Sequence, residues 1–166
     1  MHCSRLVIFM LVVVAATGCI ERPSRVPSGA YPITINPILE GNSLRYSSGM
    51  TVRDRLVIRD QASWERTWLE IVGSLRPIPP APVIDFANDV AIVAAMGTKN
   101  TGGYAIDIED VHLMDGDVWV SVHETSPGQR CIVTAAFSHP VDVAVVPRFE
   151  GKATFVERAS DHDCGP

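Results

Sequence analysis

The chain has few of the features that support catalysis or nucleic-acid binding. It has no HExxH or GxSxG motif, no Walker or GxGxxG motif, and no CxxC pair. Basic residues are scarce and form no run, since 14 Lys and Arg stand against 19 Asp and Glu in 166 residues. An acidic chain without a basic patch is not expected to bind a phosphate backbone. We therefore expect no enzymatic activity, no cofactor, no metal and no nucleic-acid partner.

The longest apolar run lies at the N-terminus. Residues 6–16 are all apolar, follow Arg5, and lead into Ala16-Thr17-Gly18-Cys19. A membrane-spanning helix needs about 20 apolar residues, whereas a basic start, a short apolar run and a small-residue exit are typical of a secretory signal. Cleavage before Cys19 resembles bacterial lipoprotein processing. We expect residues 1–18 to be a signal peptide and Cys19 to carry lipid such as palmitate. The mature chain would be extracytoplasmic and anchored to the bacterial membrane. Plain secretion and a short uncleaved anchor are the alternatives.

The remaining cysteines form a pair. Cys3 leaves with the signal and Cys19 is expected to be lipidated, which leaves Cys131 and Cys164 in the mature chain. In an oxidising compartment such a pair is read as a disulfide. It would close a loop of about 34 residues and stabilise the fold by up to about 4 kcal/mol. Two free thiols and two metal ligands are the alternatives.

The mature chain is expected to be a tether followed by one domain. Residues 19–37 are rich in proline and predict a tether with a reach of up to about 55 Å, unless residues 33–35 add an edge strand. Residues 38–166 are expected to form a single domain. Its first elements are predicted to be short strands at residues 44–46 and 56–59.

One helix is predicted, over residues 62–73. Apolar residues, among them Trp64 and Trp68, recur there at three- and four-residue spacing, and Asp60 or Ser63 can cap its start. We expect the two tryptophans to pack on a sheet; a ligand platform is the alternative.

The second half of the domain is expected to be strands. Residues 90–96 are continuously apolar, as in a central strand buried on both faces. Asp115-Gly116 predicts a hairpin tip, and Ile106 and Ile108 have the wrong parity for its apolar face, which predicts a bulge at Glu109-Asp110. Further strands are predicted at residues 131–138, 141–146 and 153–157, with a polar tail held only by Cys164. The predicted fold class is α+β, a mainly antiparallel β-sheet with one packed helix.

The glycine-containing loop at residues 97–104 is the best candidate for a binding site. It is expected at the end of a sheet, where paired glycines allow backbone angles closed to other residues. A tight structural turn is the alternative. The residues expected to contact a protein partner are Thr101, Gly102, Gly103 and Tyr104, with a second patch formed by exposed His112 and Trp119 on the outer face of the hairpin.

Two resemblances bear on this loop. Val83-Ile84-Asp85-Phe86, the apolar strand and the Thr101-Gly102-Gly103-Tyr104 segment resemble the PrcB C-terminal domain family, over about residues 55–157. The resemblance implies an exported lipoprotein that is an accessory subunit of a surface protease complex and not the protease itself. Residues 100–104 are also similar to the NPTTGY loop of chagasin-type inhibitors, which implies an alternative function as a protease inhibitor.

Overall fold

The computed structural model describes residues 25–73 and 75–165. The expected signal peptide and the expected lipidation site at Cys19 lie outside these residues. Within them, no helix is both long and apolar enough to cross a membrane.

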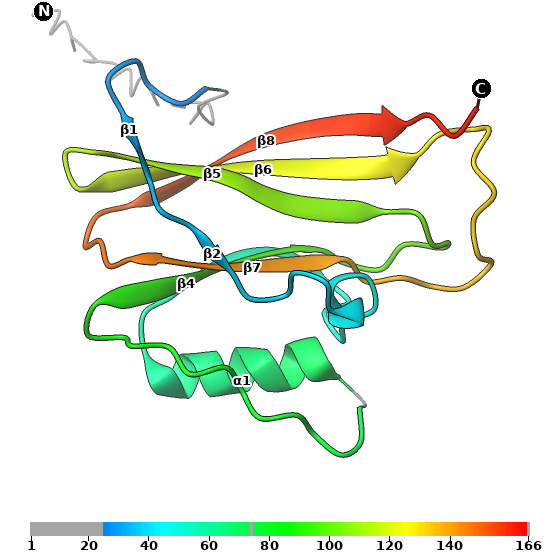
Figure 1. Ribbon diagram of the computed structural model, residues 1–166, viewed down its shortest axis with the longest axis horizontal. Helices are drawn as coiled ribbons and strands as arrows, with labels where there is room; N and C mark the ends of the chain where they lie inside the picture. The colour runs from blue at the N-terminus through cyan, green and yellow to red at the C-terminus, as the bar shows by residue number, and fades with distance from the viewer. Residues whose placement is uncertain (1–24, 74, 166) are drawn as a thin grey trace, which may run out of the picture.

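Two four-stranded sheets pack face to face, and a helix covers the outer face of one of them (Figure 1). The first sheet has the order β1 (Tyr31–Ile33), β5 (Ala105–Met114), β6 (Asp117–Pro127), β8 (Ala153–His162). The second has the order β2 (Asn36–Pro37), β7 (Val141–Pro147), β4 (Asp89–Met96), β3 (Arg53–Ile58). All pairings are antiparallel except β6 with β8. The α+β fold class with one helix is confirmed.

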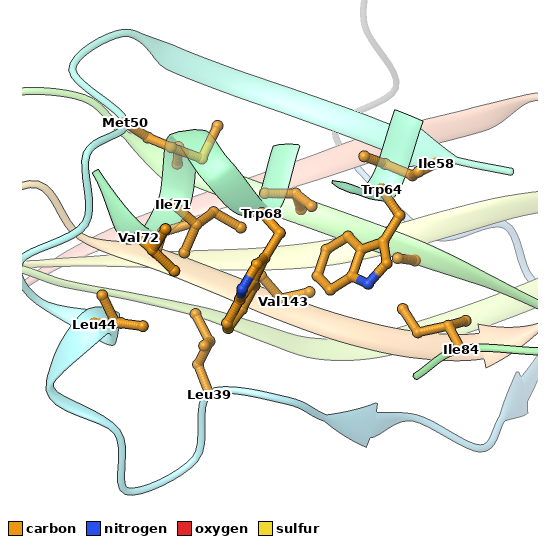
Figure 2. Close-up of a cluster of buried hydrophobic side chains, with 14 residues drawn as sticks. Leu39, Leu44, Met50, Ile58, Trp64, Trp68, Ile71, Val72, Ile84 and Val143 are labelled. Atoms are coloured by element: carbon orange, nitrogen blue, oxygen red, sulfur yellow. The ribbon is translucent and has the colours of Figure 1, made fainter. Parts of the chain in front are cut away.

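The helix α1 (Gln61–Val72) starts and ends as its sequence predicts. The Asp60 carboxylate accepts a hydrogen bond from the Ser63 amide at 2.8 Å, which caps the N-terminus, and Gly73 ends the helix with φ 56°. Trp64 and Trp68 are buried, and Figure 2 shows their indoles lying between the helix and the second sheet. The expectation that they pack on a sheet is confirmed.

The prolines that follow the helix complete this packing. The indole nitrogens of Trp64 and Trp68 donate to the carbonyl oxygens of Pro82 and Pro79 at 2.8 and 3.0 Å. A buried indole N–H needs such a partner, so the connector over residues 77–82 covers the tryptophans as well as joining α1 to β4.

The strand β4 is buried on both faces, as its apolar run predicts. Ala91, Val93 and Ala95 face the helix, while the alternate residues Val90, Ile92, Ala94 and Met96 face the first sheet. Since side chains alternate along a strand, one continuous apolar segment supplies both layers of the core.

The β5–β6 hairpin confirms the predicted register and bulge. Leu113 pairs with Val118 across the Asp115-Gly116 tip, and the pairing shifts between Ile108 and Asp110. Both tip residues have positive φ, 52° and 86°, as a type I′ turn requires. The shift places Ile106 and Ile108 in the core beside Val111.

Where β1 does not pair with β5, side chains form hydrogen bonds with the backbone groups of the β5 edge. The Ile108 amide donates to the buried Asp142 carboxylate at 2.8 Å, and Arg45 donates to the Ile106 carbonyl at 3.2 Å. Burial raises the pKa of Asp142, and hydrogen bonds from backbone amides and the charge of Arg45 oppose that rise. Asp142 therefore joins β7 of the second sheet to the bulge of the first.

Ion pairs join the other edges of the two sheets. Arg55 of β3 lies 2.5 Å from Glu124 of β6 and 3.1 Å from Glu157 of β8, and Arg53 contacts the same carboxylates. Burial works to raise the pKa of Glu157, but the hydrogen bond from Arg53 and the two arginine charges outweigh it and lower that pKa.

Two predictions in the first half of the chain are wrong. Residues 31–37 are not free tether; the edge-strand alternative is observed at somewhat different bounds, because β1 pairs with β5 and β2 pairs with β7, each at the edge of its sheet. Residues 44–46 are not a strand; Ser43–Arg45 form a 3-10 helix, η1, which begins where the Asn42 side chain accepts a hydrogen bond from the Leu44 amide.

Two predictions in the second half are also wrong. Residues 131–138 do not form a strand of either sheet. The preceding strand, β6, already pairs with β5 on one edge and with β8 on the other. Residues 158–162 are not a free tail but continue β8, whose ladder on β6 runs from Ala153 to His162. Backbone pairing at a solvent-facing edge accommodates their polar side chains. The expected disulfide between Cys131 and Cys164 is present.

Candidate binding groove

The glycine-containing loop lies at the end of the sandwich opposite the β5–β6 hairpin (Figure 1). It forms one side of a groove. The groove has a volume of about 430 Å³. Three segments that are distant in sequence line it, and every one of the described lining residues is uncharged: Tyr46, Ser47, Gly102, Gly103, Tyr104, Ala105, Thr134, Ala136, Phe137 and Ser138.

Backbone hydrogen bonds hold the loop against residues 131–138, which we call the wall segment. The Gly102 amide donates to the Thr134 carbonyl at 3.0 Å. Lys99 and Ser138 exchange two backbone hydrogen bonds of 2.8 and 3.1 Å, and the Ser138 hydroxyl donates to the Thr101 carbonyl at 2.7 Å. The loop is thus anchored at both of its ends.

The third segment is attached through His139. Its amide donates to the Tyr46 carbonyl at 3.1 Å, and its carbonyl accepts from the Ser48 hydroxyl at 2.7 Å. The turn after η1 therefore lies beside the wall segment and carries Tyr46 to the groove.

Gly102 and Gly103 pack closely on neighbouring residues. A Cβ on Gly102 would lie 2.3 Å from the Thr134 hydroxyl oxygen, and one on Gly103 would lie 2.9 Å from a Val133 methyl and 3.0 Å from Pro127 Cβ. Gly103 also has φ +89°, which favours glycine. Both glycines therefore have a structural role that does not depend on a ligand.

Aromatic side chains surround the groove. Phe137 is 70% exposed and Tyr46 is 52% exposed, while Tyr104 is half-buried with the Lys99 ammonium 5.4 Å from its ring centre. Exposed aromatic residues are enriched at protein interfaces. Sequence reasoning found Tyr104 but missed Tyr46 and Phe137, because both lay in segments interpreted as strands.

His112 and Trp119 form a separate patch. They are Cα partners on the outer face of the first sheet and are half-buried rather than exposed. His112 lies eight positions after Tyr104 in the sequence, about 27 Å at 3.4 Å per residue. The structure therefore does not bring the two expected contact surfaces together.

Two groups of charged side chains join the sheets, and one of them lies near the groove, because Arg45, next to the lining residue Tyr46, pairs with Asp107. Asp142 belongs to this group, since its carboxylate lies 3.6 Å from Arg45 and accepts from the Ile108 amide of the first sheet, whereas the Arg53–Glu157 ion pair lies at the other sheet edge. In the described part of the chain, no group of three or more His, Cys, Asp or Glu residues could hold a metal ion.

Comparison with known families finds a match, and it covers most of the segments that line the groove. Residues 90–147 match the family model described as PrcB C-terminal. The PrcB resemblance is confirmed. The match runs from β4 to β7, and so includes both the loop at residues 97–104 and the wall segment. No curated protein and no solved structure matches the chain.

Proposed function

We propose that this chain is a non-catalytic, lipid-anchored extracytoplasmic protein that binds a protein partner, as an accessory subunit of a surface protease complex. The observation that carries the proposal is the uncharged groove flanked by Tyr46, Tyr104 and Phe137, within a domain whose central strands match the PrcB C-terminal family. The matching family supports the protease-complex setting.

The chemistry of the groove favours an apolar segment of a partner protein. A charged group entering it would lose water without meeting an opposite charge on the lining residues, which is costly. An apolar side chain placed against Phe137 and Tyr46 would instead remove exposed aromatic surface from water. Full burial of a side chain of this size stabilises binding by about 1.5–3 kcal/mol.

The topology supports presentation of the groove away from the membrane. The chain enters the first sheet at the hairpin end, where Tyr31 pairs with Leu113. The groove lies at the start of β5, where Ala105 is eight residues from Leu113, or about 27 Å along the strand. If Cys19 carries lipid, the residues before Pro27 can span at most about 28 Å. The tether therefore joins the domain at the hairpin end, at the opposite end of the sandwich from the groove.

Site-specific crosslinking in intact cells tests this proposal. A photocrosslinking residue at position 101 should capture a discrete protein, and Phe137→Ala should lower that capture about tenfold, as loss of a central aromatic contact does. Val83→Ala is the matched control, because Val83 is 99% exposed, follows the connector and does not line the groove. Capture that falls equally in both variants, or no specific adduct from position 101, would contradict the proposal.

The anchor is tested separately. Cys19→Ser should release the folded protein from the membrane fraction into the medium. Retention of the variant in the membrane would show that lipid on Cys19 is not the anchor.

A further inference from the structure

We propose that the Cys131–Cys164 disulfide is a clasp on the groove, and that thiol–disulfide exchange with a dithiol reductant loosens the wall segment while the sandwich stays folded. The inference concerns regulation of the groove, and its consequence for partner binding depends on the proposed function.

Apart from the disulfide, the first half of the wall segment is held by one backbone hydrogen bond of 3.0 Å from the Cys131 amide to the Gly128 carbonyl and by the contact of half-buried Val133 with Gly103. Residues 131–136 belong to no strand, and Ile132 is 103% exposed. The segment is tied to the glycine-containing loop at Thr134 and Ser138. Segments with few buried apolar contacts open locally at low cost, so the covalent link at Cys131 is the strongest constraint on this side of the groove.

The other half of the clasp is attached to a rigid element. Cys164 follows β8, whose pairing with β6 continues to His162 opposite Pro127. The Gly128 amide also donates to the His162 carbonyl at 2.8 Å. These contacts do not involve the disulfide, so reduction should leave β8 in place. It should release only the wall segment and the few residues after β8.

The disulfide is accessible to an exchanging thiolate. Cys164 is exposed and Cys131 is half-buried. Arg130, next to Cys131, forms an ion pair with Asp163, next to Cys164.

The exchange step balances with a dithiol as co-reactant. One thiolate of the reductant attacks a sulfur of the Cys131–Cys164 bond, forms a mixed disulfide and releases the other cysteine as a thiolate, which takes up a proton. The second thiol of the reductant loses its proton and displaces the first cysteine, which is protonated in turn. The chain gains two thiols, and the reductant leaves as a disulfide.

Backbone NMR on the full-length protein in detergent micelles tests the clasp. On reduction with dithiothreitol, the heteronuclear 15N NOE should fall for residues 131–137, and the Gly102 amide resonance should shift because its acceptor is Thr134. The amides of β4 should not change. Fast motions in the folded state report local release even where global stability also falls.

A variant keeps the test independent of the reductant. The double variant Cys131→Ser, Cys164→Ser should reproduce the reduced spectrum without dithiothreitol and should not respond to it. An unchanged NOE over residues 131–137, or collapse of the whole spectrum on reduction, would overturn the clasp.

The consequence for the partner has its own readout. Capture from position 101 should fall when the clasp is removed by the double variant. Failure of capture by the oxidised protein counts against the proposed function, whereas a rigid wall segment in the reduced protein counts against the clasp. The two failures are therefore distinguishable.

Discussion

Substitution of Gly103 by alanine measures how closely the glycine-containing loop packs on its neighbours. The new Cβ would lie 2.9 Å from a Val133 methyl and 3.0 Å from Pro127 Cβ, at φ +89°. The backbone conformation costs an L-residue about 1–2 kcal/mol, and crowding against a proline ring adds about 1–3 kcal/mol. We expect Gly103→Ala to lower the free energy of unfolding by about 2–5 kcal/mol.

Gly116→Ala is the matched control. Gly116 has nearly the same φ, +86°, but no atom lies within 4 Å of its added Cβ. Gly116→Ala should therefore lower the free energy of unfolding only by the cost of the backbone conformation, about 1–2 kcal/mol. With a urea m-value of about 2 kcal/mol/M, the further crowding at Gly103 should separate the two unfolding midpoints by about 0.5–1.5 M. The assay is urea unfolding followed by tryptophan fluorescence, since Trp64 and Trp68 are buried.

Equal losses in the two variants would refute the reasoning. They would mean that the loop moves away from Pro127 and Val133 without cost, and that Gly103 is present only for its φ. A larger loss for Gly103→Ala would show that the position of the loop, and with it one side of the groove, depends on a close approach.

Two further predictions concern the core. Trp64→Ala should lower the free energy of unfolding by about 3–5 kcal/mol, measured by thermal or urea unfolding. Leu69→Ala, on the exposed side of the same helix, should lower it by less than about 0.5 kcal/mol. Similar losses in the two variants would contradict the placement of the helix. Folding raises the pKa of Asp142 above its usual value of 3.8. The contribution of this group to the free energy of unfolding is therefore full at low pH, and it is lost as the pH rises above 3.8 through the pKa of the folded state. The stability of the wild type relative to Asp142→Asn should therefore fall from about pH 3 upward, and a difference that is flat or rises with pH would contradict that assignment.

Local patterns predicted the elements that depend on neighbours in sequence. The helix, its Asp60 cap, the doubly buried β4, the Asp115-Gly116 turn and the bulge after Ile108 all follow from apolar spacing and turn chemistry. The bulge is informative because parity alone required one extra residue to bring Ile106 and Ile108 into the core.

The errors occur where availability of a sheet edge decided the outcome. The apolar content of residues 131–138 predicts a strand, but β6 had no free edge for it. Residues 158–162 are polar and resemble a tail, yet they pair with the free edge of β6 as part of β8. Backbone hydrogen bonding depends on what lies alongside a segment, and a pattern read along one segment does not contain that information.

The sequence by itself determined the export and lipidation prediction, the cysteine pair, the main core strands, the helix and the Thr101–Tyr104 candidate. Only the tertiary structure decided the groove, because its sides come from residues near 46, 103 and 136 that approach one another through hydrogen bonds between distant segments. The same reason explains why sequence reasoning missed Tyr46 and Phe137 as groove residues. Their aromatic character is visible in the sequence, but their exposure beside one groove depends on which neighbours leave them uncovered.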